Sequence, residues 1–369
     1  MQIPEFKQKT NLSSPVWQSK TCEKAEISAS ALNSPAFVPR RGLQGGHLQT
    51  IFSHFLPRKT SLPEGERRLF QVEAKVQILC LCHWHPNHHS RLTLILVHGL
   101  EGSVDSQYVL GTASKAWSAG MNVIRMNVRN CGGTESLAPT LYHSGMSGDI
   151  AAVVSQLIRD EGLARISLAG FSMGGNQVLK LAGEWGSGEA GPTPPHVVAV
   201  AAVSPAIDLS ACADALHKLS NRLYEVRFLL SLRSRVRRKL ALFPDRFRIR
   251  HFWWTSIRDF DNVVTAPHCG FRDAEHYYEC ASSSRLIHNI AVPTLILHAK
   301  DDPFIRVLPE TRAKVLANPH ILYHETDHGG HCGFLADPQG DYDGRWSEQQ
   351  VIRFLLSVNG SSGDERHGC

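Results

Sequence analysis

One stretch decides the fold of this chain: Arg165-Ile166-Ser167-Leu168-Ala169-Gly170-Phe171-Ser172-Met173-Gly174-Gly175-Asn176. It starts as a short apolar run, and a helical pattern from Gln177 to Ala182 follows it directly. Between them, Gly-x-Ser-x-Gly around Ser172 predicts a sharp strand-to-helix turn that strains the serine backbone and lifts its hydroxyl above a sheet. Glycines fit at 170 and 174 because strand and helix pass too close there for a Cβ atom. The stretch therefore predicts a nucleophilic serine at the end of a strand.

Strands and helices alternate on both sides of this turn. The run Leu92–Val97 is continuously apolar, which is typical of a strand buried on both faces of a parallel sheet. Arg67–Glu73 and Val76–Trp84 alternate as the strands of an edge hairpin do. Further strands are expected at Met121–Val128, His196–Ser204, Pro293–His298 and His320–Glu325, and helices at Ser106–Ala119, Ser147–Glu161, Glu310–Ala317 and Trp346–Ser357. This alternation predicts an α/β fold with an open, mostly parallel, doubly wound sheet.

The length fits one large α/β domain with an insertion, or two modest domains. The chain has 369 residues, of which 42% are hydrophobic and 20% charged, as is ordinary for a globular enzyme. Its nine cysteines follow no framework spacing, which favours reduced thiols in a cytoplasmic protein. Met1–Lys20 lacks the apolar core of a signal peptide, and no run approaches the roughly 18 apolar residues of a membrane span.

The alternation also predicts the domain boundaries. Residues 1–35 are polar and without periodicity, so we expect a flexible arm. Residues 36–205 would form the first part of the core and 291–358 the second. Between them the alternation stops, so 206–290 is expected to be a cap insertion, and 359–369 a disordered tail rich in Gly and Ser.

A serine hydroxyl needs a base to act as a nucleophile near neutral pH, and the base needs a partner that fixes its tautomer. Asp302 follows the predicted strand at 294–298, and His331 follows the one at 321–325. Because ligands bind beyond the carboxyl ends of strands in such sheets, we expect Ser172, Asp302 and His331 to meet there.

Neighbouring residues compete for two of these roles. Asp301 precedes Asp302, and we favour Asp302 because it stands directly before a proline, with the other carboxylate capping the turn. His328 precedes His331, and the glycines around His331 favour a tight loop that presents its ring. Asp208, after the strand that ends at Ser204, is a weaker candidate for the acid.

Ester hydrolysis also needs donors for the oxyanion. One is expected to be the backbone N–H of Met173, the residue after the nucleophile. The other is expected from the loop after His98-Gly99, namely the N–H of Leu100.

Two patterns resemble metal sites. Cys80-Leu81-Cys82-His83-Trp84-His85 has no second Cys/His pair at zinc-finger spacing, so we interpret it as a strand end and a polar loop. His324-Glu325-Thr326-Asp327-His328 matches a zinc-protease pattern that requires a helix, whereas these residues end an apolar strand. We therefore expect neither a metal nor a cofactor.

The predicted insertion is strongly basic. Lys218–Arg250 holds eleven Lys and Arg against two acidic residues, although the whole chain has a net charge of only +5. Apolar and aromatic residues are interleaved with these charges, which is typical of helices that lie on an anionic membrane surface. The same pattern fits a solvated cap whose apolar side covers the active site. Binding of nucleic acid has no other support in the sequence.

Taken together, these residues resemble the YheT-like family of α/β-hydrolases, also called AB hydrolase family 4. The matching segments, in the family's order over about residues 37 to 358, are His47-Leu48-Gln49-Thr50, His98-Gly99-Leu100-Glu101-Gly102-Ser103, Arg129-Asn130-Cys131-Gly132-Gly133-Thr134, Tyr142-His143-Ser144-Gly145, Gly170-Phe171-Ser172-Met173-Gly174-Gly175-Asn176, Tyr277-Tyr278, Asp302-Pro303 and Gly329-Gly330-His331-Cys332-Gly333-Phe334.

The resemblance implies an α/β-hydrolase fold, a Ser172–Asp302–His331 triad, and esterase or lipase activity on carboxylic esters, including acylglycerols or phospholipids. Relatives from fungi make or cleave medium-chain fatty acid ethyl esters. The chain departs from the family at Asn130, where relatives often carry glycine. We also expect no N-terminal membrane anchor of the kind that the animal members have.

Three hypotheses follow. The first is a serine carboxylester hydrolase for medium or long acyl chains, with peripheral contact to an anionic membrane. The second is acyl transfer to an alcohol in the same site. The third is a non-catalytic lipid- or membrane-binding protein on the same scaffold, which the complete set of catalytic residues disfavours.

Overall fold

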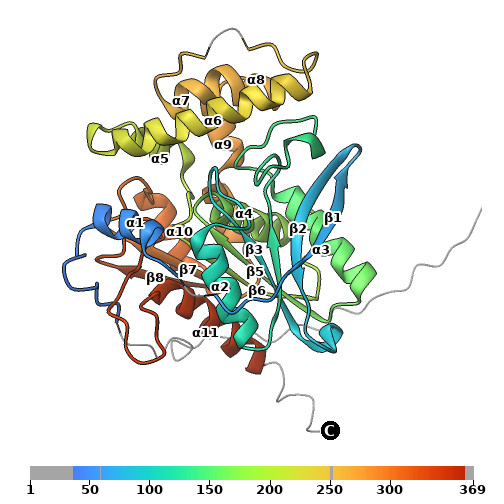
Figure 1. Cartoon of the computed structure of the whole chain (residues 1–369), viewed down its shortest axis with the longest axis vertical. Helices are drawn as coiled ribbons and strands as arrows, with labels where there is room; N and C mark the ends of the chain where they lie inside the picture. The colour runs from blue at the N-terminus through green and yellow to red at the C-terminus, as the bar shows by residue number, and fades with distance from the viewer. Residues whose placement is uncertain (1–35, 59, 250–251, 362–369) are drawn as a thin grey trace, which may run out of the picture.

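The structure, a computed structural model, describes residues 36–58, 60–249 and 252–361. The predicted arm, 1–35, and residues 362–369 of the predicted tail lie outside this range. Figure 1 shows a layer of strands with helices on both of its faces and a further group of helices at one end. Within the described residues, no helix combines the length and apolar content that crossing a membrane requires.

The strand layer is one eight-stranded sheet in the order β1-β2-β4-β3-β5-β6-β7-β8. The strands are β1 (Glu66–Glu73), β2 (Val76–His83), β3 (Leu92–Val97), β4 (Asn122–Met126), β5 (Arg165–Phe171), β6 (Val197–Val203), β7 (Thr294–Ala299) and β8 (Ile321–Thr326). β1 pairs antiparallel with β2, and β2 with β4, while all other neighbours are parallel. The predicted edge hairpin and mostly parallel sheet are thus confirmed.

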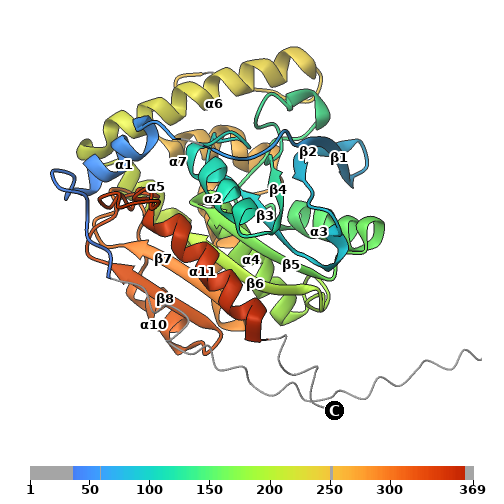
Figure 2. The same ribbon diagram turned by 60° about the horizontal axis from the view of Figure 1, so that its bottom comes forward.

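The two faces of the sheet bury separate apolar cores, because successive side chains of a strand point to opposite sides. On β3, Ile95 and Val97 belong to one core, and Leu92, Leu94 and Leu96 to the other. Helices α3 (Ser147–Glu161), α4 (Met173–Ser187) and α10 (Pro309–Ala317) contribute to the first core, and α2 (Gln107–Ser118) and α11 (Trp346–Ser361) to the second. Figure 2 shows α2 and α11 in front of the strands.

The last helix differs from its prediction. It was expected to end at Ser357, with a disordered tail from residue 359, but α11 continues to Ser361. Val351, Phe354 and Leu355 of this helix are buried in the second core. Once these buried residues hold the helix in place, it extends into the following residues, although Gly and Ser there have a weak intrinsic preference for helix.

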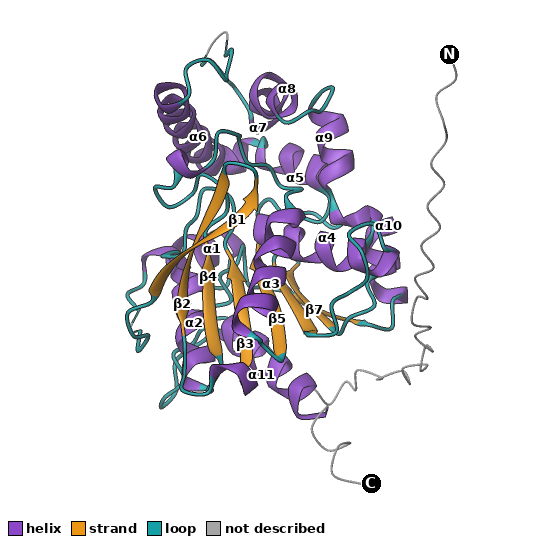
Figure 3. Ribbon diagram, turned by 90° about the vertical axis from the view of Figure 1, so that its right-hand side faces the viewer, coloured by secondary structure: helices purple, strands orange, loops and turns teal. Residues whose placement is uncertain are grey.

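The segment between β6 and β7 is helical. It holds α5 (Leu209–Leu216), α6 (Arg222–Leu242), α7 (Ile257–Phe260), α8 (Ala266–His268) and α9 (Ala274–Ala281). Figure 3 shows α6 to α9 stacked above the strands, and we call α5 to α9 the cap helices. Helix α1 (Gly46–Phe55), near the start of the described chain, lies against the N-terminal half of α6 (Figure 2).

Candidate active site

Ser172 occupies the predicted turn between β5 and α4. Its φ of 55° is unusual for a residue with a side chain. The surrounding backbone holds it there, because its N–H donates to Val203 O at 2.9 Å and its carbonyl accepts from the N–H groups of Asn176 and Ala206 at 3.0 and 3.2 Å. Strand β6 and helix α4 therefore stabilise the strained serine.

The glycines around Ser172 are required by close backbone approach, as the sequence predicted. A Cβ atom at Gly170 would collide with the carbonyl of Gly174, and one at Gly174 would lie 2.5 Å from the carbonyl oxygens of Val97 and His98. A Cβ atom at Gly99 would lie 3.0 Å from that of Ser172. The loop after β3 can approach the serine because these positions lack side chains.

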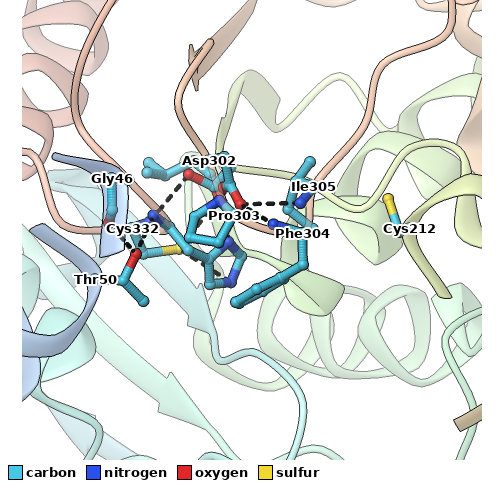
Figure 4. Close-up of polar contacts among 12 residues, drawn as sticks. Gly46, Thr50, Cys212, Asp302, Pro303, Phe304, Ile305 and Cys332 are labelled. Atoms are coloured by element: carbon cyan, nitrogen blue, oxygen red, sulfur yellow. Dashed lines mark hydrogen bonds and ion pairs between the residues drawn. The ribbon is translucent and has the colours of Figure 1, made fainter. Parts of the chain in front are cut away.

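Asp302 and His331 come together beyond the ends of β7 and β8. The Oδ2 atom of Asp302 lies 2.9 Å from Nδ1 of His331, and its Oδ1 accepts the N–H groups of Phe304 and Ile305 at 3.1 and 2.9 Å (Figure 4). Asp302 is only 2% exposed. Burial alone would raise the pKa of this carboxyl, but the adjacent imidazole and the backbone donors lower it below its ordinary value.

The ring of His331 is close to a sulfur atom. Its Nε2 lies 3.9 Å from Sγ of Cys332, and no hydrogen bond joins it to Ser172 Oγ among the described contacts, although both residues line the same groove. Catalytic hydrogen bonds of this kind often tighten only when substrate is bound. Burial would lower the pKa of His331, but the Cys332 sulfur and the Asp302 carboxylate raise it above the ordinary value of 6.5.

Helix α1 supports the loop that carries His331, a role that the sequence reasoning missed. Thr50 Oγ1 accepts the N–H of His331 at 2.8 Å (Figure 4). The buried amide of Gln49 donates to Leu335 O at 3.1 Å and accepts the Leu335 N–H at 2.6 Å. A Cβ atom at Gly330 would collide with Gly46 O. The only sequence signal was the segment His47–Thr50, which the family resemblance included without a function.

The competing candidates have other partners. Asp301 was expected to cap a turn, but its Oδ2 lies 3.3 Å from Nδ1 of His328, and its Oδ1 accepts the Gly330 N–H at 2.8 Å. Each of the two adjacent carboxylates therefore faces its own histidine, and it is Asp302 that also binds the turn amides. Asp208 accepts the Leu308 N–H at 2.9 Å and the Thr311 hydroxyl at 2.8 Å, so it holds the start of α10.

The loop after β3 is fixed by a buried histidine. The Val128 N–H donates to Nε2 of His98 at 3.0 Å, so Nδ1 carries the proton and donates to Gly99 O at 2.7 Å. Burial lowers the pKa of His98 to about 4, which keeps it neutral. Leu100 and Met173, the predicted oxyanion donors, line one cavity together with Ser172.

Glu101, next to Leu100, connects this loop to the cap helices. Its φ is 57°, and its carboxylate accepts the Tyr142 hydroxyl at 2.6 Å and Nε of Arg235 at 2.8 Å, with the Ser231 hydroxyl as a third donor. Burial would raise the pKa of this carboxyl, but Arg235 and the hydroxyl donors lower it. The sequence reasoning did not assign this buried ion pair between the loop and α6.

Two hollows meet at Ser172. One is an apolar cavity under the cap helices, with lining residues that include Leu141, Leu209, Leu216, Leu232, Val236 and Phe260. The other is a groove that leads from Ser172 and His331 to the surface between α1 and α6. An extended apolar group would therefore fit in the cavity on one side of Ser172, and a polar group would fit in the groove on the other.

Several charges of the basic segment point inward. Arg235 pairs with Glu101, and Arg238 lies 2.7 Å from Glu135. Nζ of Lys239, which is fully buried, donates to Asn130 Oδ1 at 3.1 Å, and burial lowers its pKa to about 8. Asn130 has a φ of 62°, which asparagine tolerates better than most residues, so glycine is not required there. The apolar side of α6, with Phe228, Leu232 and Val236, lines the apolar cavity.

The two metal-like patterns take the positions expected of them. Cys80 and Cys82 are buried in the same core, and His324 and Glu325 lie on β8. Over the part of the chain that the structure describes, no group of three or more His, Cys, Asp or Glu is arranged to hold a metal ion.

Comparison with known proteins agrees with this architecture. The family model described as "alpha/beta hydrolase fold" matches residues 93–338. The protein "Putative esterase YheT" of Escherichia coli (strain K12) is 33% identical over 349 residues, which cover 92% of this chain and 97% of that protein. The monoacylglycerol lipase of Saccharomyces cerevisiae is 30% identical over 272 residues, which cover 71% of this chain and 58% of the lipase.

A solved structure shows the same fold. The esterase Pf2001 of Pyrococcus furiosus superposes with a TM-score of 0.52 at 17% identity, over 82% of this chain and 98% of that one. At this identity the likeness concerns the fold alone.

Proposed function

The chain belongs to the α/β-hydrolase family, in the group of YheT, and on that premise we propose that it is a serine carboxylester hydrolase for medium- or long-chain acyl esters such as acylglycerols. One observation carries this proposal. The strained Ser172 lies where an apolar cavity and an open groove meet, and the groove also holds His331, which is paired with the buried Asp302.

In the proposed acylation step, Ser172 Oγ attacks the carbonyl carbon of the ester while His331 Nε2 accepts its proton. Asp302 keeps the proton of the neutral ring on Nδ1 and stabilises the imidazolium that forms. The backbone N–H groups of Leu100 and Met173 donate hydrogen bonds to the carbonyl oxygen and so stabilise the negative charge that forms on it. The tetrahedral intermediate then breaks its bond to the alcohol oxygen, which leaves with the proton from His331.

In the deacylation step, His331 takes a proton from water and the resulting hydroxyl attacks the acyl-enzyme. The carboxylic acid is released, and Ser172 regains its proton. The apolar cavity would hold the acyl chain, and the groove would pass the alcohol out and water in. An alcohol that replaced water at this step would give acyl transfer in the same site.

Labelling with a fluorophosphonate tests the nucleophile. We expect the Ser172→Ala variant to lose both labelling and esterase activity, because no other group supplies the attacking oxygen. The Ser187→Ala variant, which changes an exposed serine at the end of the same helix, should label like the unmodified protein. Full labelling of Ser172→Ala would reject the proposal.

A series of acyl esters from acetyl to palmitoyl tests the substrate class. Each buried methylene contributes about 0.8 kcal/mol, so kcat/KM should rise by about fourfold per added methylene until the apolar cavity is filled. A preference for acetyl esters over the longer members would contradict the assignment of the cavity to an acyl chain.

A further inference from the structure

Helix α1 exposes an apolar stripe to solvent. Leu48, Ile51, Phe52 and Phe55 are spaced as one face of a helix, and all four are exposed, Phe55 by 69%. An adjoining side of the same helix is anchored to the protein through the buried Gln49. The stripe is therefore held rigidly at the surface.

The start of α6 exposes a second stripe. Leu223, Val226 and Leu230 recur at intervals of three and four residues, so they share one side of the helix. Leu219 lies in the short 3-10 turn that precedes the helix. Leu219 is 90% exposed and Leu223 85%. The neighbouring side of α6 carries the residues that enter the core, including Leu229 and Leu232. Exposed apolar residues gathered in this way commonly mark an interaction site.

The two stripes adjoin. The rings of His47 and Tyr224 stack with centroids 5.7 Å apart, and Nη2 of Arg227 lies 3.2 Å from Nε2 of His54. These contacts occur in the same order along both helices, so α1 and α6 run in the same sense, as Figure 2 shows. On each helix the stripe lies beside the contact residues, and the two stripes therefore form one surface, which we call the α1–α6 face.

The groove to Ser172 opens at this face. Its walls include His54 and Phe55 from α1 and Tyr224 and Arg227 from α6. A molecule that entered the groove from the surface would thus pass beside this face.

The charge around the face is positive. Residues 36–63 contain no Asp or Glu, and from 218 to 244 the only acidic residue is Glu225, which is fully buried. Lys218 and Arg227 are exposed beside the stripes. In the groove, the carboxylates of Asp105, Glu101, Glu135 and Glu348 are each paired with an arginine. Two copies of this face would repel one another, whereas an anionic surface would attract it.

We infer that the α1–α6 face docks on a phospholipid bilayer that contains anionic headgroups. The apolar stripes enter the boundary between headgroups and acyl chains, and the basic side chains contact the headgroups. Together with the proposed function, which this inference extends, docking places the groove so that an acyl ester reaches Ser172 directly from the lipid.

Sedimentation with vesicles tests the docking. The full-length protein is mixed with vesicles of phosphatidylcholine, alone or with phosphatidylglycerol, at low and high salt. A double variant, Leu48→Asp with Leu223→Asp, changes one residue of each stripe and neither lines the groove. Leu316→Asp on α10, where the leucine is 62% exposed, is the matched control. A milder pair, Leu219→Ser with Leu223→Ser, serves if the aspartates impair folding.

We expect the unmodified protein and Leu316→Asp to sediment with phosphatidylglycerol-containing vesicles, and a smaller fraction of each to sediment at high salt. The affinity of the double variant for these vesicles should be lower by about tenfold or more. Activity on a short soluble ester should be unchanged in the variants, and activity on vesicle-borne ester should fall in the double variant. No sedimentation of the unmodified protein, equal binding to pure phosphatidylcholine, or equal loss in Leu316→Asp would overturn the inference.

Two further measurements separate the alternatives. If light scattering showed a dimer that the double variant converted to a monomer, the face would bind a second copy and the inference would fall. Ser172→Ala should bind vesicles like the unmodified protein, so a failure of the proposed catalysis would leave the docking result unaffected.

Discussion

At the scale of single residues, the candidate site depends on which of two adjacent carboxylates faces which histidine. Asp302 is buried, binds two backbone amides and lies 2.9 Å from His331, whereas Asp301 is more exposed and lies 3.3 Å from His328. Interactions between exposed groups are weakened by water, so only the first pair can fix a tautomer firmly.

Substitution of each pair tests this difference. His331→Ala should lower kcat/KM for a soluble ester by several orders of magnitude, as removal of a catalytic base generally does, and Asp302→Asn should have a similarly large effect. His328→Ala and Asp301→Asn are the matched controls and should cost far less. If the controls proved to be the inactive variants, the roles assigned to the two pairs would be wrong.

The pH dependence of hydrolysis should reflect the raised pKa of His331. The base must be neutral to accept a proton, so activity falls as the pH decreases through that pKa. Because Cys332 and Asp302 together outweigh burial, kcat/KM should reach half its maximum at a pH above 6.5. In Asp302→Asn the residual activity should show this midpoint at lower pH. A pH–rate profile of both proteins measures the shift, and a midpoint below 6.5 in the unmodified protein would contradict it.

At the scale of elements, the loop after β3 is held from two sides. His98 binds it to the segment after β4 through Val128, and Glu101 binds it to α6 through Arg235 and Ser231. The cap helices therefore do more than cover the cavity, since α6 also fixes the residue beside the predicted oxyanion donor.

Glu101→Gln should reduce kcat more than it raises KM. The substitution keeps the size of the side chain but removes the charge that Arg235 binds, so the Leu100 amide is held less firmly where charge develops. Hydrogen bonds to charged groups contribute about 1.5–3 kcal/mol, which sets the expected loss at about tenfold to a hundredfold. Arg222→Met breaks an ion pair within α6, away from this loop, and is the control. Equal losses in the two variants would argue against a specific role of Glu101.

At the scale of the whole molecule, segments far apart in the sequence converge on α4. The buried side chain of Asn176 donates to Ser144 O at 3.1 Å and Ala281 O at 2.8 Å, and accepts the Ser283 N–H at 2.8 Å. One amide therefore joins α4 to the loop before α3 and to the end of the cap helices.

Asn176→Ala should destabilise the protein as a whole. The variant leaves two carbonyls and one N–H without their buried hydrogen-bond partner. Each group that stays unsatisfied should lower the free energy of unfolding by about 1–3 kcal/mol. Urea unfolding should show a lower midpoint than in the unmodified protein. Ser155→Ala removes an exposed hydrogen bond within α3 and should change stability by less than about 0.5 kcal/mol. Equal midpoints for the two variants would contradict the linking role of Asn176.

The sequence by itself determined the features that depend on local chemistry. The periodicity of apolar residues predicted the eight strands and the helices α2, α3, α4, α10 and α11, because burial imposes a period on each element separately. It did not predict the separate helices between β6 and β7. The glycines at 170 and 174 predicted the strained turn, since the steric requirement lies within one short segment. Chain order and strand ends were enough to place Ser172, Asp302 and His331 at one edge of the sheet.

Only the tertiary structure decided which distant groups meet. The support of His331 by Thr50 joins residues 281 positions apart, and the ion pair of Glu101 with Arg235 joins residues 134 apart. The inward turn of the basic residues on α6, and the exposure of its leucines beside α1, likewise depend on how the helix is rotated against its neighbours. A sequence pattern fixes the spacing of side chains along a helix, but packing against other elements decides which of its sides is buried.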